Sequence, residues 1–163
     1  MNYILHHIQE IADITDKIAK NLPLKEEVII GIHELLMNAI EHGNLEIGYE
    51  LKSELLRSGK WLDEINDRLE MPKYKNRKVH IEIKKAEDNY EIIIKDDGNG
   101  FNWQEYINKN QDNTALHGRG ILMAFNSGFG KIIFNEIGNE VTCVLSPDVF
   151  FEVPDFSHLF PPP

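Results

Sequence analysis

The first forty residues contain two stretches in which apolar residues recur every three or four positions, as on one face of a helix. The first stretch predicts a helix that ends at Asn21-Leu22-Pro23, because proline cannot continue a helix. Its apolar positions are Ile4, Ile8, Ile11, Ile14 and Ile18. The second stretch predicts a helix from about Leu24 to His42, stopped by Gly43-Asn44. Its apolar positions are Val28, Ile32, Leu35 and Ala39.

The middle of the chain, from Tyr49 to Leu69, is charged but keeps a helical spacing of apolar residues. Ser58-Gly59 interrupts this stretch and Pro72 closes it, so we expect two helical pieces. The apolar side is expected to consist of Leu51, Leu55, Leu62, Ile65 and Leu69.

From Val79 the apolar residues alternate with polar ones, which indicates half-buried strands. Four strands are expected, around 79–84, 90–95, 131–135 and 140–145. A short helix is expected from Gly120. This order of elements predicts an α+β two-layer sandwich, with helices on one face of a mixed, mainly antiparallel sheet. Residues 1–146 would form one domain, followed by a proline-containing tail at 147–163.

Composition and charge narrow the functional classes. The chain has 163 residues and a formal net charge of −10, which argues against general affinity for nucleic acids or anionic membranes. It has no apolar run long enough to span a bilayer and no signal-peptide pattern at its start. Cys143 is the only cysteine, which rules out an intrachain disulfide. A cytoplasmic location is therefore expected.

Glu34 and Asn38 lie four residues apart in the second predicted helix, so their side chains project to the same side. An amide oxygen is a suitable Mg²⁺ ligand, and a carboxylate can accept a proton from an attacking hydroxyl. This pair suits phosphoryl transfer, although both residues could simply belong to an exposed polar face. His42 could contact phosphate or merely lie near the helix end.

Asp96 follows an apolar strand and begins the pattern Asp96-x-Gly98-x-Gly100. A carboxylate held there can accept a hydrogen bond from the exocyclic amine of adenine, which guanine does not offer at that position. The two glycines allow the backbone to approach a flat base. A plain strand-to-loop turn is the alternative interpretation, and Asp97 is the competing adenine contact.

A third motif, Gly118-Arg119-Gly120-Ile121, comes directly before the short predicted helix. Backbone amides at a helix start, together with the Arg119 charge, can bind phosphate groups. The alternative is a helix-start loop without a ligand. The polar segment between the second and third motifs, from about Asn102 to Leu116, is expected to be a mobile lid.

The three motifs in this order resemble the N, G1 and G2 boxes of the GHKL ATPase and kinase superfamily. The closest resemblance is to the anti-sigma-factor serine-protein kinases, and it covers about Ile4 to Leu145. It implies a Bergerat fold that binds ATP and Mg²⁺. By this resemblance Asn38 would hold Mg²⁺, Glu34 would be the general base, and Asp96 would bind adenine. The glycines of the second and third boxes would shape the pocket.

One departure from the family pattern lies on the last strand pair. Family members often have Gly-Thr there, with the threonine near adenine, whereas Gly138 is followed by Asn139. Thr142 is the candidate substitute.

The resemblance implies a STAS-domain anti-anti-sigma protein as the phosphorylated partner. A bound sigma factor and a homodimer are further implied partners, with no direct contact to nucleic acid or membrane. One alternative is a nucleotide-gated switch that captures a partner without transferring phosphate. Another is the ATPase domain of a histidine-kinase-like signalling protein, although His6-His7 lacks the sequence context of a phosphoacceptor histidine. Glu34 is the residue that distinguishes a kinase from a nucleotide-gated switch, because phosphate transfer needs a base and nucleotide binding does not.

Overall fold

The computed structural model describes residues 1–86, 89–103 and 128–145. The strands form one five-stranded sheet in the order β1-β2-β3-β5-β4. Their bounds are β1 Asn2–Leu5, β2 Val79–Ala86, β3 Asn89–Asp96, β4 Lys131–Phe134 and β5 Glu140–Leu145. Every pairing in this sheet is antiparallel. The expected antiparallel character is confirmed, whereas the expectation of a mixed sheet is wrong for the described strands, because neighbouring strands run in opposite directions throughout.

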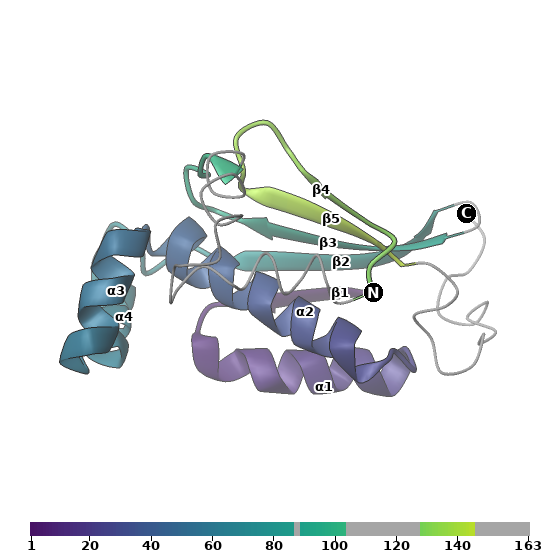
Figure 1. Ribbon diagram of the computed structural model, residues 1–163, viewed down its shortest axis with the longest axis horizontal. Helices are drawn as coiled ribbons and strands as arrows, with labels where there is room; N and C mark the ends of the chain where they lie inside the picture. Colours follow the sequence, from purple (N-terminus) through teal and green to yellow (C-terminus); the bar gives the residue numbers. More distant parts are fainter. Residues whose placement is uncertain (87–88, 104–127, 146–163) are drawn as a thin grey trace.

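Two helices lie on one face of the sheet, which confirms an α+β two-layer sandwich. Helix α1 (Ile11–Asn21) and helix α2 (Glu26–Asn38) lie side by side under this face (Figure 1). Alternate strand residues point toward them and are buried. These residues are Val79, Ile81, Ile83, Ile92, Ile94, Val141, Cys143 and Leu145. The apolar positions predicted for the second helix are buried against this layer, so its predicted face is confirmed. The α-helix itself ends at Asn38, and the last predicted position, Ala39, begins a π-helical turn, Ala39–Asn44.

The N-terminus differs from the predicted helix. Residues Asn2–Leu5 form strand β1 at the edge of the sheet, a 3-10 turn covers Ile8–Glu10, and α1 begins only at Ile11. Ile4 is 52% exposed whereas Leu5 is fully buried, which is the alternation of a strand. The Glu10 carboxylate accepts hydrogen bonds from the amides of His6 and His7 at 2.6 and 2.8 Å. These bonds hold the chain where the strand gives way to the helix.

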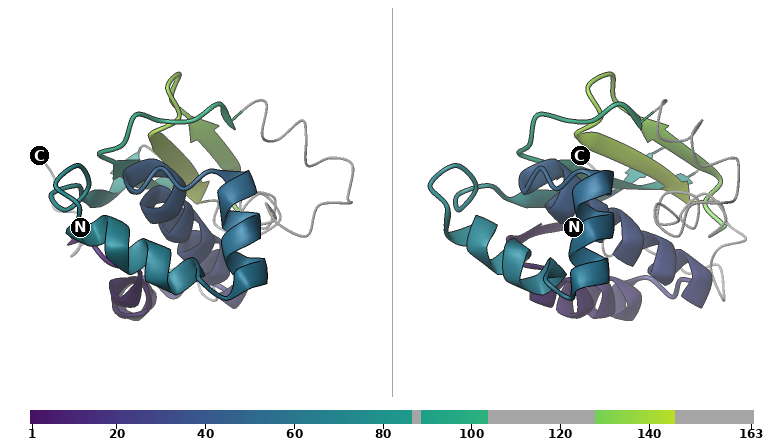
Figure 2. Two further views of the ribbon diagram at one scale, coloured as in Figure 1. Left: turned by 90° about the vertical axis from the view of Figure 1, so that its left-hand side faces the viewer. Right: turned by 60° about the vertical axis from the view of Figure 1, so that its left-hand side comes forward.

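A helical hairpin stands at one end of the sandwich, as Figure 2 shows. It consists of α3 (Tyr49–Ser58) and α4 (Trp61–Glu70), joined at Gly59 in the left-handed conformation with φ 70°. The predicted break at Ser58-Gly59 is thus confirmed. Leu55 and Ile65 are buried as expected, but Leu62 is 46% exposed and does not belong to the apolar side.

Several predicted features lie outside the described residues. They are the short helix from Gly120, nearly all of the proposed lid and the tail at 147–163. In the part of the chain that the structure describes, no helix is both long enough and apolar enough to cross a membrane.

Candidate functional site

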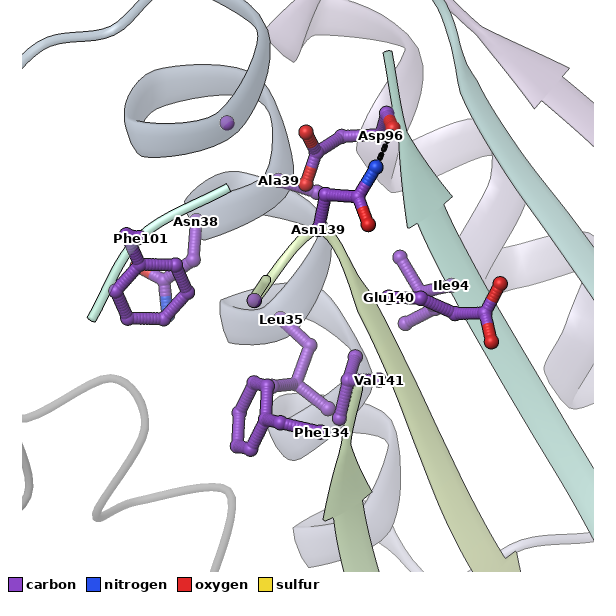
Figure 3. A pocket seen from close by; sticks show the side chains of 12 residues that line it. Leu35, Asn38, Ala39, Ile94, Asp96, Phe101, Phe134, Asn139, Glu140 and Val141 are labelled. Carbon is purple, nitrogen blue, oxygen red and sulfur yellow. Dashed lines mark hydrogen bonds between the residues drawn. The ribbon is translucent and has the colours of Figure 1, made fainter. Parts of the chain in front are cut away.

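A pocket opens between the C-terminal half of α2, the end of β3 and the start of β5 (Figure 3). It encloses about 350 Å³, including the space at its open mouth. One group of lining residues comes from α2 and the turn after it, and the other comes from the sheet and its loops. The lining residues are Leu35, Asn38, Ala39, Gly43, Ile94, Asp96, Phe101, Phe134, Gly138, Asn139, Glu140 and Val141.

Asp96 supplies the buried carboxylate of the pocket, with only 6% of the residue exposed. Its Oδ1 accepts a hydrogen bond from the Gly98 amide at 2.8 Å. No Lys or Arg side chain of the described region forms an ion pair with it. Burial therefore raises the pKa of Asp96 from 3.8 to about 7, against the opposing effect of the Gly98 amide. A buried carboxylate without a cation is costly to the fold, which suggests that a ligand uses it.

Asp97, the competing candidate for the adenine contact, makes its own contacts outside the pocket lining. Its Oδ2 accepts a hydrogen bond from the Lys78 amide at 2.9 Å, and its Oδ1 lies 3.6 Å from His80 Nε2. Asp97 does not line the pocket. The strand register therefore favours Asp96 over Asp97 as the ligand contact.

Glycines let the two walls of the pocket meet backbone to backbone. A Cβ atom at Gly98 would lie 2.1 Å from the carbonyl oxygen of Gly43, and a Cβ at Gly43 would lie 2.3 Å from the Asp96 carboxyl carbon. Gly100 has φ +78°, and a Cβ there would lie 1.8 Å from the carbonyl oxygen of Ile137. These contacts explain the glycines of the Asp96-x-Gly98-x-Gly100 pattern. They also add Gly43, which the sequence suggested only as a helix stop.

Asn38 lines the pocket from α2, whereas Glu34, one turn earlier on the same helix, does not. Both residues are half-buried. The Asn38 Nδ2 atom is buried and has no hydrogen-bond partner among the described residues. An amide left unsatisfied at a pocket wall usually costs about 1–3 kcal/mol, so a ligand there would recover lost hydrogen bonding.

Aromatic rings close one side of the pocket. Phe101 meets Phe134 edge to face with ring centres 6.1 Å apart, and Trp103 stacks against Phe134 with ring centres 5.3 Å apart. The Trp103 indole donates to the backbone carbonyl of Asn135 at 3.1 Å. Phe101 and Phe134 thus supply flat apolar surface beside the Asp96 carboxylate, as an aromatic base would require.

Asn139 is a pocket residue for which the sequence predicted no role. Its Nδ2 donates to the backbone carbonyl of Asp96 at 3.3 Å (Figure 3). Its Oδ1 accepts from Asn135 Nδ2 at 2.7 Å. The sequence signal for a role of Asn139 in the pocket was its position directly after Gly138. Thr142, the predicted substitute, does not line the pocket. Val141 and Cys143 are buried toward the helices, so strand alternation turns Thr142 to the opposite face.

His42 does not line the pocket either. Its Nδ1 donates to the carbonyl of Ile47 at 2.5 Å, and its ring stacks on Tyr49 at 4.5 Å. Burial lowers the pKa of His42, so the ring is neutral at physiological pH. The structure thus gives His42 packing contacts at the helix end and no place beside Asp96.

The predicted phosphate-binding residues Gly118, Arg119, Gly120 and Ile121 lie outside the described residues. In the described ranges, no group of three or more His, Cys, Asp or Glu side chains could hold a metal ion. Asn38 is the predicted metal ligand that the pocket does contain. A cation there would need further ligands from a bound anionic group.

No family model matches this chain, and no curated protein matches it. The function is therefore inferred from the chemistry of the pocket. It combines a buried carboxylate acceptor, apolar and aromatic walls, glycine-lined backbone and one unsatisfied amide. This combination suits a flat, hydrogen-bonding, partly apolar ligand such as a purine base.

Proposed function

We propose that this protein is an ATP-binding serine-protein kinase of the anti-sigma-factor type with a Bergerat fold. The observation that carries the proposal is the buried Asp96 carboxylate, which has no cation partner among the described residues and lies in a glycine-lined pocket beside α2. Its Oδ1 is oriented by the Gly98 amide, and its flanking walls are apolar. A fixed acceptor between apolar walls is what recognition of the adenine amine requires.

Asn38 is suited to the polar end of the nucleotide. Its Nδ2, a donor without a hydrogen-bond partner among the described residues, lies at the same pocket as Asp96, and its Oδ1 is the atom that could ligate a metal. Asn38 would supply a neutral oxygen ligand to Mg²⁺, which would neutralise phosphate charge when bound. A neutral ligand fits a site in which the phosphates themselves provide the remaining oxygens.

Glu34 is the proposed general base. It is half-buried on α2, one turn before Asn38, and lies outside the pocket lining. A protein substrate must bring its serine hydroxyl from solvent, so a base outside the pocket lining suits this reaction better than one inside it. Glu34 would take the hydroxyl proton as the serine oxygen attacks phosphorus. The substrate class is a STAS-domain partner, by resemblance alone.

The position of Glu34 also keeps a second candidate function open: a nucleotide-gated switch that binds a partner without phosphotransfer. Binding needs only Asp96 and Asn38, which line the pocket, and the glycines that let the backbone segments around it approach closely. Glu34 has no contact in the described structure that commits it to chemistry.

A single-turnover assay with labelled ATP and candidate STAS proteins tests the proposal. We expect phosphate transfer by the wild type and a loss of about 10²–10⁴-fold in rate for Glu34→Ala, with ATP affinity retained. Asn38→Ala should weaken both Mg²⁺-dependent binding and transfer. Tight ATP binding without transfer to any STAS candidate would favour the switch. Full activity of Glu34→Ala would remove Glu34 as the base.

A further inference from the structure

The loop that follows Asp96 is held from outside the pocket by two side chains. The Asp97 amide donates to Asn44 Oδ1 at 2.8 Å, and Asn99 Nδ2 donates to Glu46 Oε1 at 3.0 Å. Both acceptors belong to the chain just after α2. The loop between them contains Gly98, whose amide orients the Asp96 carboxylate. These two contacts therefore bear on the geometry of the pocket.

Asn44 makes its contact at a cost to the fold. The residue is only 2% exposed, and its Nδ2 has no hydrogen-bond partner within the described part of the chain. A buried unsatisfied amide generally destabilises a fold, so an apolar residue would be expected here if packing alone mattered. The Oδ1 contact to the Asp97 amide is the one interaction that explains an asparagine at this position.

Glu46 also has a feature that is unfavourable for the fold, in this case its backbone conformation. It is the only non-glycine residue of the described chain with a positive φ, at 54°. Glycine adopts this left-handed conformation without strain, whereas other residues do so at a cost. A glutamate at such a position indicates that its side chain is needed.

Glu46 is in turn fixed by the connection between α4 and β2. Its carboxylate pairs with Lys73 and, at 2.9 Å, with Arg77, and these cations lower the pKa of Glu46. Arg77 also donates to the carbonyl of Asn44 at 2.8 Å. Arg68 on α4 donates to the carbonyls of Leu45 and Glu46. The helical hairpin is thus connected through Glu46 to the loop after Asp96.

We propose that Glu46 is a positioning residue for nucleotide affinity, which acts through Asn99 to hold the Asp97–Asn99 loop in its binding geometry. The inference rests on the proposed function, because it assumes that the pocket binds a nucleotide. This role falls on a residue, Glu46, that lies outside the three sequence motifs. It also makes the hairpin α3–α4 and the connection after it part of the binding apparatus.

Calorimetric titration with Mg²⁺-ATP tests the inference on the full chain. Glu46→Gly and Asn99→Ala should each raise Kd about 3- to 10-fold, the usual effect of one lost hydrogen bond. The double variant should be no weaker than either single variant, since both remove the same contact. Glu46→Gln keeps an acceptor oxygen for Asn99 and should restore most of the affinity.

Two further measurements separate positioning from general stability. The urea midpoint of Glu46→Gly should be close to that of the wild type, because relief of the positive φ offsets the loss of partly exposed ion pairs. Asp13→Ala, which breaks the exposed Lys17 pair on α1, should leave Kd unchanged. Wild-type affinity in both loop variants, or additive losses in the double variant, would overturn the inference. A wild type that binds no nucleotide would instead refute the proposed function, and the inference with it.

Discussion

Asp96 illustrates how a single residue can oppose folding and serve binding. Its carboxylate is buried and has one oriented amide donor, Gly98, but no paired cation in the described structure. The folded protein therefore prefers the neutral acid, whereas a nucleotide amine would prefer the charged acceptor. A bound ligand that donates to Asp96 would relieve this conflict.

The raised pKa of Asp96 predicts a specific pH dependence of stability. Its pKa is about 7 in the folded state against 3.8 without burial, so the folded state holds the proton between these values. The stability associated with Asp96 is therefore greatest below about pH 4 and is lost as pH rises through about 7. Asp96→Asn should raise the free energy of unfolding by roughly 2–4 kcal/mol near pH 8 and by little near pH 4. Urea unfolding at the two pH values measures this. A gain that does not vary with pH would contradict the assignment.

The close approach of Gly98 to the Gly43 carbonyl can be tested with a pair of matched glycine substitutions. Gly98→Ala would place a Cβ 2.1 Å from the Gly43 carbonyl oxygen, so we expect destabilisation of about 1–3 kcal/mol and weaker nucleotide binding. Gly48→Ala is the control, because a Cβ at Gly48 meets nothing within 4 Å and its φ is −72°. The control should change stability by about 0.5 kcal/mol or less. Equal effects of the two substitutions would show that the close approach of the walls is not needed.

Among the elements, the helices and strands with many periodic residues were predictable, and the short N-terminal strand was not. The isoleucine spacing from Ile4 to Ile18 fits a helix, yet Tyr3 and Ile4 pair with Ile81 and His80 across the sheet edge. A four-residue strand carries too few positions for its alternation to outweigh the helical spacing that follows it. Leu62 was placed wrongly because the hairpin α3–α4 stands at the end of the sandwich, where only one side of each helix meets the core.

The hairpin α3–α4 is attached to the turn after α2 through Glu41, which is fully buried. The Glu41 carboxylate accepts a hydrogen bond from Lys52 on α3 at 2.6 Å and another from the Trp61 indole on α4 at 2.5 Å. Glu41→Ala should lower the free energy of unfolding by about 3–5 kcal/mol, because it leaves Lys52 and the indole without their partner. Asp13→Ala removes an exposed ion pair of α1 and should lower it by about 0.5 kcal/mol at most. Chemical denaturation of both variants compares the two effects. Similar losses would show that Glu41 does not anchor the hairpin.

At the scale of the whole molecule, the pocket brings together segments that lie far apart in the sequence. The sequence predicted Asn38, Asp96, Gly98 and Gly100 because each belongs to a recognisable spacing. It could not predict Phe101 packing on Phe134, or the Gly43 carbonyl against Gly98, because these contacts depend on how α2 crosses the sheet. Asn139 was missed for the same reason, since its role depends on pairing beside Asp96.

Calorimetric titration of the wild type and Asp96→Asn with Mg²⁺-ATP and Mg²⁺-GTP tests the central claim most directly. We expect the wild type to bind ATP and to bind GTP much more weakly, because only adenine offers its amine to the carboxylate. Asp96→Asn should remain folded but bind ATP about 10- to 150-fold more weakly, the usual loss for a buried charged hydrogen bond. Equal binding of ATP and GTP by the wild type, or unchanged ATP affinity in Asp96→Asn, would contradict the account.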